Sequence, residues 1–177
     1  IDHCLVGSEM CIRDRWRNNF KGIRYINEEA GYNFGGAVDD IWEKPNGDLI
    51  VIDVKSTSKN VFDWEDTYSK WEYAKGYRRQ LEMYQWLLEK NGFNVASEGY
   101  LVYYNGKKHE PMFNQQLTFD LHLVKLECDN SWVEEAVLNA KATLDGDMPK
   151  PARSCDNCNY LRKRWEVSQK KPENLLD

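Results

Sequence analysis

The sequence predicts an α/β (α+β) fold in which a mixed central β-sheet is flanked by helices. One basis is the near-continuous apolar run at residues 50–54 (IVIDV), which is typical of a strand covered on both faces and therefore central in a sheet. The other is residues 68–91, where large apolar side chains recur every three or four positions before the helix stop Asn91-Gly92. Further strand and helix patterns follow, which indicates a sheet with helices packed on it.

The expected elements have the order β-β-α-β-β-α. Residues 34–42 and 49–54 are rich in Val, Ile and Leu and flank the turn Pro45-Asn46-Gly47-Asp48, so they predict a β-hairpin. The helix at residues 68–91 comes next. After it, the patterns predict strands at residues 99–104 and 117–126 and an amphipathic helix at residues 132–144.

The chain divides into three predicted parts. At residues 6–14 (VGSEMCIRD) it resembles a translated sequencing adapter, so we expect the segment 1–15 to be non-native. Residues 16–148 are expected to form one domain, since this length buries a sizeable core without disulfide bonds. Residues 149–177 hold prolines, basic residues and a C-x-x-C pair, and predict a basic C-terminal strap.

Composition excludes several classes of function. No apolar run approaches the roughly 18 residues that a membrane helix needs, so no membrane partner is expected. The formal net charge of −5 argues against a protein that coats nucleic acid by bulk electrostatics, but it leaves room for a local basic groove. The five cysteines are scattered apart from Cys155 and Cys158, which indicates a reducing cytoplasm and not a secreted disulfide framework.

Charged residues stand within the predicted hairpin, where a strand should enter the core. Asp53 and Lys55 are two residues apart, so they project from one face of a strand, and the hairpin brings Asp39 or Asp40 alongside. Neighbouring carboxylates suit Mg²⁺ or Mn²⁺, and a lysine beside them could orient water or stabilise charge on a phosphate. On spacing alone, a same-face ion pair with turn carboxylates nearby is the simpler interpretation.

Three motifs occur in order along the chain: G-x-x-D at 36–39, I-D-V-K at 52–55 and Q-x-x-x-Y at 80–84. The Gln and Tyr of the third motif are four residues apart and share one helical face. This ordered set, on the expected strand, strand and helix, resembles the core of PD-(D/E)xK nucleases and is most similar to their RecB-like branch. The resemblance implies a restriction-endonuclease-like core that hydrolyses DNA phosphodiester bonds with a divalent metal.

The resemblance also implies a role for each matching residue of the hairpin. Asp39 and Asp53 would be metal ligands for Mg²⁺ or Mn²⁺, together with the backbone carbonyl of Val54. Lys55 would be the catalytic lysine.

Two further expectations come from the same resemblance. Gln80 and Tyr84 would act in catalysis by positioning the DNA strand or the lysine. The first helix of the family supplies an acidic or histidine residue before the hairpin, and Glu28 or Glu29 could fill that place.

The Cys pair raises the question of a second cofactor. Some RecB-like nucleases close an iron–sulfur cluster with one cysteine before the core and three near the C-terminus. Cys155 and Cys158 match two of these, but Arg164 stands where a third is expected, and Cys128 is predicted to be a small buried hydrophobe. Two ligands are too few for a Cys₄ cluster or a closed zinc site, so we expect a remnant of a cofactor site in this chain.

Three functions are compatible with these features. The leading hypothesis is a cytoplasmic, Mg²⁺-dependent deoxyribonuclease in DNA repair, recombination or foreign-DNA processing, with a helicase or other DNA-processing protein as a possible partner. The second is a catalytically inactive nucleic-acid-binding module with the same fold. The third is a structural interaction domain that docks a partner through residues 150–171.

Overall fold

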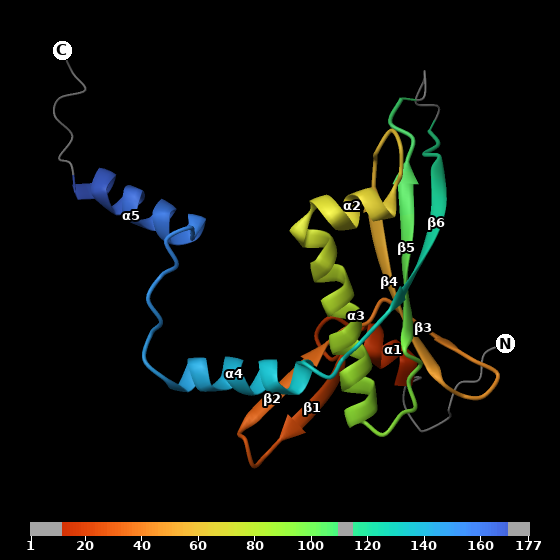
Figure 1. The fold of residues 1–177 in the computed structure, drawn as a ribbon, viewed down its shortest axis with the longest axis horizontal. Coiled ribbons are helices and arrows are strands. Elements are labelled where there is room, and N and C mark those ends of the chain that lie inside the picture. The colour runs from red at the N-terminus through yellow and green to blue at the C-terminus, as the bar shows by residue number, and fades with distance from the viewer. Residues whose placement is uncertain (1–11, 110–114, 170–177) are drawn as a thin grey trace. The chain divides into compact units, whose positions relative to one another are not determined.

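The structure, a computed structural model, describes residues 12–109 and 115–169. Figure 1 shows their helices and strands. The chain forms two units, one that ends at Leu138 and one that begins at Asn139. The first unit contains the β-strands and the hydrophobic core, so the predicted hairpin and its charged residues all lie in it.

The central sheet of the first unit is mixed, as the sequence predicts. Its strands are β3 (Asp40–Glu43), β4 (Leu49–Thr57), β5 (Glu98–Gly106) and β6 (Phe119–Glu127). They lie in the order β3-β4-β5-β6, with β4 parallel to β5 and the other two pairings antiparallel. Parallel neighbours need a crossover connection, which is formed by α2 (Trp64–Lys70) and α3 (Glu72–Lys90).

β4 lies inside the sheet because its sequence is apolar on both faces. Its first five residues are all buried. Val51 belongs to the main core together with Leu81 of α3, whereas Ile52 belongs to a second cluster together with Ile50. This burial on both faces confirms the predicted central strand, and it carries Asp53 into the interior.

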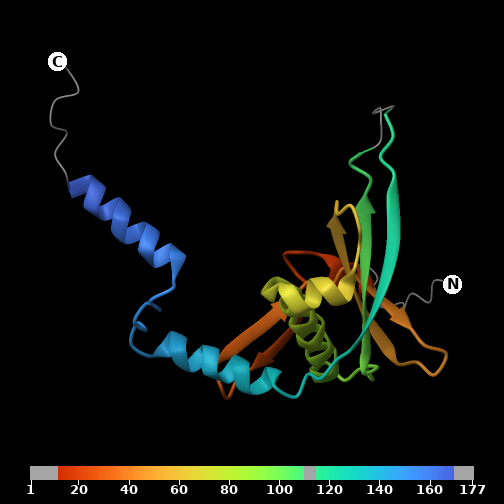
Figure 2. The ribbon, with the colours of Figure 1, turned by 45° about the horizontal axis from the view of Figure 1, so that its top comes forward.

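The single helix expected at residues 68–91 is two helices. Trp71 has an extended backbone (φ −120°, ψ 118°) and separates α2 from α3. α2 starts earlier than expected because the Asp63 side chain caps it, accepting a hydrogen bond from the backbone N–H of Asp66 at 2.9 Å. α3 lies beside the sheet in both ribbon views (Figures 1 and 2) and buries Leu81 and Leu88 against it.

The expected strand at residues 34–42 is divided between two sheets, so this part of the prediction is wrong. β1 (Ile23–Asn27) and β2 (Tyr32–Gly36) form a separate two-stranded antiparallel sheet, and only β3 pairs with β4. The pairing stops between β2 and β3 because the N–H of Val38 donates to the carbonyl of Trp16, in α1 (Ile12–Arg17), at 3.1 Å. Both pieces are rich in apolar residues, and their sequence pattern does not reveal the break.

Glu28 and Glu29 lie in the turn between β1 and β2 and not on a helix, and both are exposed. Gly36 pairs with Ile23 at the opposite end of this hairpin, from which the chain continues to Asp39. The two glutamates are therefore at the far end of the hairpin from the predicted metal ligands. The expectation that either one supplies a first-helix acidic residue is wrong.

The division between the units falls within α4 (Val133–Asp145), and the second unit contains α5 (Asp156–Gln169). The predicted boundary at residue 148 lies in this second unit. α5 has no buried residue.

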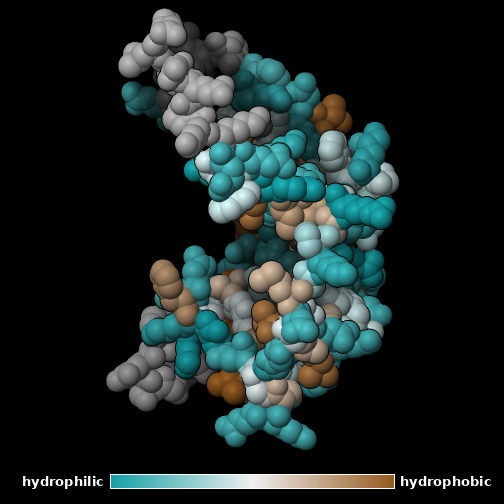
Figure 3. All heavy atoms as spheres, turned by 90° about the vertical axis from the view of Figure 1, so that its left-hand side faces the viewer, coloured by the Kyte–Doolittle hydropathy of each residue, from teal (hydrophilic) through white to brown (hydrophobic). Residues whose placement is uncertain are grey.

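On the face drawn in Figure 3, apolar side chains are dispersed among polar ones. Across residues 12–109 and 115–169, no helix is long and apolar enough to span a membrane.

Candidate active site

Asp53 is the most buried charged residue of the predicted site. Its side chain is 1% exposed, and Nζ of Lys55 lies 2.5 Å from its Oδ2. In the described part of the chain, neither carboxylate oxygen has a donor in hydrogen-bond geometry, so the lysine is an ionic partner. Burial raises the pKa of Asp53 to about 6, the nearby Lys55 lowers it in part, and the carboxylate of Asp39 raises it further. This carboxyl group is costly to bury and poorly compensated, which is typical of a functional residue.

Asp39 lies in the connection between β2 and β3 and is exposed. The pairing of β3 with β4 ends at Asp40 and Ile52, and beyond it Oδ2 of Asp39 accepts a hydrogen bond from the N–H of Val54 at 2.8 Å. The Asp39 side chain thus continues the pairing along the edge of β4. Because the N–H and C=O of one strand residue point to the same edge, the carbonyl of Val54 is directed toward that edge too.

Lys55 is held from three sides. Its ammonium contacts Asp53, donates to Oε1 of Gln80 at 3.2 Å and lies 4.6 Å from the ring centre of Tyr77. Its side chain remains 18% exposed, so the charge faces the buried carboxylate and stays within reach of a bound molecule. Asp53 and Lys55 share a face because they are two residues apart on β4, as the sequence predicts.

Gln80 and Tyr84 form the next link of the same network. Nε2 of Gln80 donates to the hydroxyl of Tyr84 at 3.0 Å, while Oε1 of Gln80 accepts from Lys55. Burial raises the pKa of Tyr84, so its hydroxyl is protonated at neutral pH. Gly36 packs against the Tyr84 ring, and a Cβ at Gly36 would stand 2.6 Å from Cε1. This close approach explains the glycine of the first motif.

The structure brings together the side chains that were predicted to be catalytic, namely Asp39, Asp53, Lys55, Gln80 and Tyr84. The donor set fits a hard divalent cation, because the oxygens of Asp53 have no hydrogen-bond partner beyond their ionic contact with Lys55, and a second carboxylate, Asp39, lies near it. Among residues 12–109 and 115–169, no three His, Cys, Asp or Glu side chains gather into a metal site. Mg²⁺ accepts such a sparse set, since it binds through one or two carboxylates and retains several waters.

The cysteine pair lies in the second unit, at the start of α5. The N–H of Cys158 donates to Sγ of Cys155 at 3.4 Å, and this contact lowers the pKa of the Cys155 thiol. Cys128 belongs to the first unit, where it packs against the core, and burial raises its pKa to about 11. Cys128 was predicted to be a small buried hydrophobe; it packs against the core as expected, but it is only partly buried.

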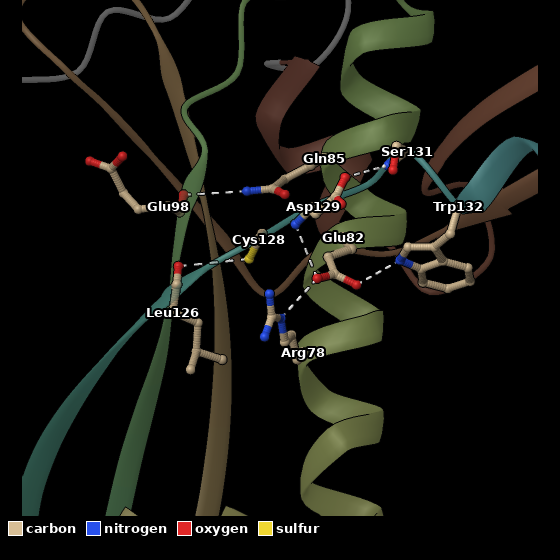
Figure 4. Close-up of polar contacts among 9 residues, drawn as sticks. All are labelled: Arg78, Glu82, Gln85, Glu98, Leu126, Cys128, Asp129, Ser131 and Trp132. Carbon is tan, nitrogen blue, oxygen red and sulfur yellow. Dashed lines mark hydrogen bonds and ion pairs between the residues drawn. The ribbon is translucent and has the colours of Figure 1, made fainter.

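A buried polar cluster that was not predicted from the sequence lies on the face of α3 that meets the segment after β6 (Figure 4). The carboxylate of Glu82 accepts from Nε of Arg78 at 2.9 Å, from the N–H of Asp129 at 3.1 Å and from Nε1 of Trp132 at 2.7 Å. Three donors satisfy this buried acid, in contrast to Asp53. The i,i+4 spacing of Arg78 and Glu82 is the only sequence signal for it.

Fold and site together define a mixed α/β protein that carries a buried carboxylate–lysine pair on its central strand. A family model described as "PD-(D/E)XK nuclease superfamily" matches residues 6–162. The chain belongs to this superfamily, whose members are usually metal-dependent nucleases, and the superfamily-level resemblance is confirmed.

No curated protein matches the chain. The solved structure "Crystal structure of SSO0001" is similar at 20% identity with a TM-score of 0.37, over 74% of this chain and 50% of that one. The chain thus spans about half the length of that protein.

Proposed function

We propose that this chain is a Mg²⁺- or Mn²⁺-dependent deoxyribonuclease of the RecB-like branch. The observation that carries the proposal is the Asp53–Lys55 pair, a buried carboxylate without hydrogen-bond donors and an ammonium 2.5 Å from it. A structural ion pair gains little from such an arrangement, because the ammonium of Lys55 offsets only part of the desolvation of the acid. A site that binds a cation and an anionic substrate requires it.

Asp39 and Asp53 would hold the cation, with the carbonyl of Val54 as a third protein ligand. When bound, a divalent cation stabilises negative charge on the phosphate and lowers the pKa of a water. Asp39 is already fixed toward the edge of β4 by the N–H of Val54, so little reorganisation is needed on this side of the site.

Lys55 would stabilise the negative charge that develops on the phosphate when water attacks. Its ammonium is oriented by Oε1 of Gln80 and by the ring of Tyr77. Tyr84 fixes the amide of Gln80 through its hydroxyl, so that the amide oxygen faces the lysine. Gln80 and Tyr84 are thus positioning residues for Lys55, and they lie where they could also contact the DNA strand.

DNA as the substrate, cytoplasmic location and a helicase or other DNA-processing partner are parts of this proposal. DNA is favoured because the chain belongs to a nuclease superfamily. The cytoplasm is favoured because the three cysteines of the described residues are all free thiols. A role in repair, recombination or foreign-DNA processing follows from the proposed branch.

The test is a titration of Mg²⁺ and of Mn²⁺ with end-labelled linear DNA and with circular DNA. We expect cleavage that EDTA abolishes, and a loss of at least about 100-fold in the Lys55→Ala variant. An Asp53→Asn variant should be equally inactive. Cleavage that survives either substitution or persists in EDTA would refute the proposal. DNA binding without turnover would favour the inactive binding module instead.

A further inference from the structure

A pocket of about 180 Å³ lies beside the candidate site, between the end of β4, the helices α2 and α3, and β5. Four aromatic side chains line it: Phe62, Tyr73, Tyr77 and Tyr103. None of the residues predicted to be catalytic is part of its lining. The volume is below the roughly 300 Å³ at which pockets for drug-sized ligands begin, so it suits a single flat ring.

The pocket shares a wall with the candidate site. Tyr77 lines the pocket, and its ring also faces the ammonium of Lys55 at 4.6 Å. Tyr103 is the residue of β5 that pairs with Lys55 in the sheet. A ring held in the pocket would therefore lie next to the group that we propose to meet the phosphate.

The aromatic lining continues from the interior to the surface. Tyr103 is 5% exposed and packs against Phe62 with ring centres 4.9 Å apart, whereas Tyr73 is 47% exposed. Trp71 is 54% exposed, and its ring centre lies 6.0 Å from that of Tyr73. Aromatic rings on a substrate path provide surfaces on which successive bases stack, whatever their sequence.

Lys59 adds a cation to the polar side of the pocket. Its ammonium donates to the hydroxyl of Thr67 at 2.5 Å, and both its N–H and its carbonyl are hydrogen-bonded to the side chain of Asn105, at 2.8 and 3.0 Å. In the described ranges Lys59 has no carboxylate partner, whereas Lys70 of α2 is paired with Asp66. The charge of Lys59 is thus fixed in place and remains available to an anion.

We propose that this pocket binds one base of a single-stranded DNA substrate next to the scissile bond, and that Lys59 contacts the phosphate of that nucleotide. This proposal rests on the nuclease function proposed above. Base pairing and stacking in a duplex hide the faces that the pocket would receive, so the substrate must be unpaired at this position. The pocket then gives the enzyme its preference for single-stranded DNA.

The experiment measures the binding of a labelled single-stranded oligonucleotide and of the matched duplex to the full chain by fluorescence anisotropy, in EDTA so that no cleavage occurs. We expect Tyr73→Ala to weaken single-strand binding about tenfold and Tyr73→Phe to leave it unchanged, because the phenyl ring keeps its stacking face. Lys59→Ala should weaken binding. It should also lower the number of ions released on binding, read from the slope of log affinity against log salt concentration, by about one. The matched controls are Tyr104→Ala, an exposed tyrosine outside the pocket, and Lys70→Ala.

Three outcomes overturn the pocket proposal. Tyr73→Ala and Tyr104→Ala weaken single-strand binding equally, or the pocket substitutions weaken the binding of duplex and of single-stranded DNA equally, or the parent chain does not bind single-stranded DNA. Thermal unfolding verifies that each variant is folded. If the parent chain cleaves DNA but substitution of Tyr73 and of Lys59 does not change DNA binding, the pocket proposal is rejected and the nuclease proposal stands. Binding that depends on both residues, without cleavage in Mg²⁺ or Mn²⁺, would support the pocket and reject the nuclease proposal.

Discussion

Gly36 lies directly against the ring of Tyr84, so closely that a Cβ atom at Gly36 would be 2.6 Å from Cε1 of the tyrosine. Two motifs that are far apart in the sequence contact each other at this point. Tyr84 accepts a hydrogen bond from Gln80, and Gln80 accepts one from Lys55. The absence of a side chain at Gly36 therefore supports the position of the lysine.

Replacement of Gly36 by alanine should displace the ring of Tyr84 and loosen its contact with Gln80. We expect a destabilisation of about 1–3 kcal/mol from overpacking, and about tenfold slower DNA cleavage. Urea unfolding and steady-state cleavage rates measure the two effects. Gly76→Ala is the control, because a Cβ there meets no atom within 4 Å, and alanine in α3 should stabilise by about 0.5–1 kcal/mol. Unchanged stability and activity in Gly36→Ala would contradict the close packing.

The pKa of Asp53, raised to about 6 mainly by burial, makes the stability of the metal-free protein depend on pH. Between pH 4 and pH 6 the folded state binds more protons than the unfolded state, so stability falls as the pH rises through this window. Asp53→Asn removes the titrating group. In EDTA at pH 7, we expect the variant to be more stable than the parent by on the order of 2 kcal/mol, and the difference to vanish near pH 4.

Urea unfolding of parent and variant across pH 4 to 8 measures this difference. Addition of Mg²⁺ at pH 7 should stabilise the parent and leave Asp53→Asn unaffected, because a ligand that binds only the folded state raises its stability. A flat difference between the two proteins across the pH range would show that Asp53 titrates normally.

Glu82→Gln should destabilise the first unit by about 2–4 kcal/mol. The substitution replaces a buried carboxylate that accepts from Arg78, Asp129 and Trp132 with an amide whose NH₂ group cannot accept. Glu89→Gln, on the exposed side of the same helix, should stay within about 0.5 kcal/mol of the parent. The measurement is urea unfolding followed by tryptophan fluorescence. Equal effects of the two substitutions would mean that the Glu82 cluster contributes nothing specific.

The cysteine pair should hold no iron–sulfur cluster in this chain. Iron and sulfide analysis of anaerobically purified protein should find neither element at a stoichiometric level, because two thiols are too few for a cluster. Cys155→Ser and Cys158→Ser should retain the cleavage rate of the parent. A brown protein with stoichiometric iron would contradict this prediction and require further ligands besides Cys155 and Cys158.

Much of the first unit could be predicted because its strongest sequence signals come from burial. The run around Ile52 is apolar on both faces, and β4 is indeed an interior strand. The three motifs also identified side chains that the structure brings together. The signal for the strand is local, whereas the signal for the site residues came from the resemblance to PD-(D/E)xK nucleases.

The errors arose where a long-range contact decides local structure. The N–H of Val38 donates to the carbonyl of Trp16, and this hydrogen bond separates β2 from β3, which belong to different sheets. Trp71 interrupts a helical pattern that continues on both sides of it. The Glu82 cluster depends on partners beyond β6, and the aromatic pocket depends on side chains from four elements. Periodicity in one segment carries no information on such partners.

The hydrogen bond from the N–H of Val54 to Asp39 makes the amide NMR signal of Val54 a probe of the site. A carboxylate that accepts from a backbone amide shifts the resonance of that amide and slows its exchange with solvent. Because Asp39 is also a proposed metal ligand, capture of a cation would draw electron density from this bond. The ¹⁵N–¹H signal of Val54 should then move during a Mg²⁺ titration, without any substrate, and it would report the affinity of the site for the ion directly.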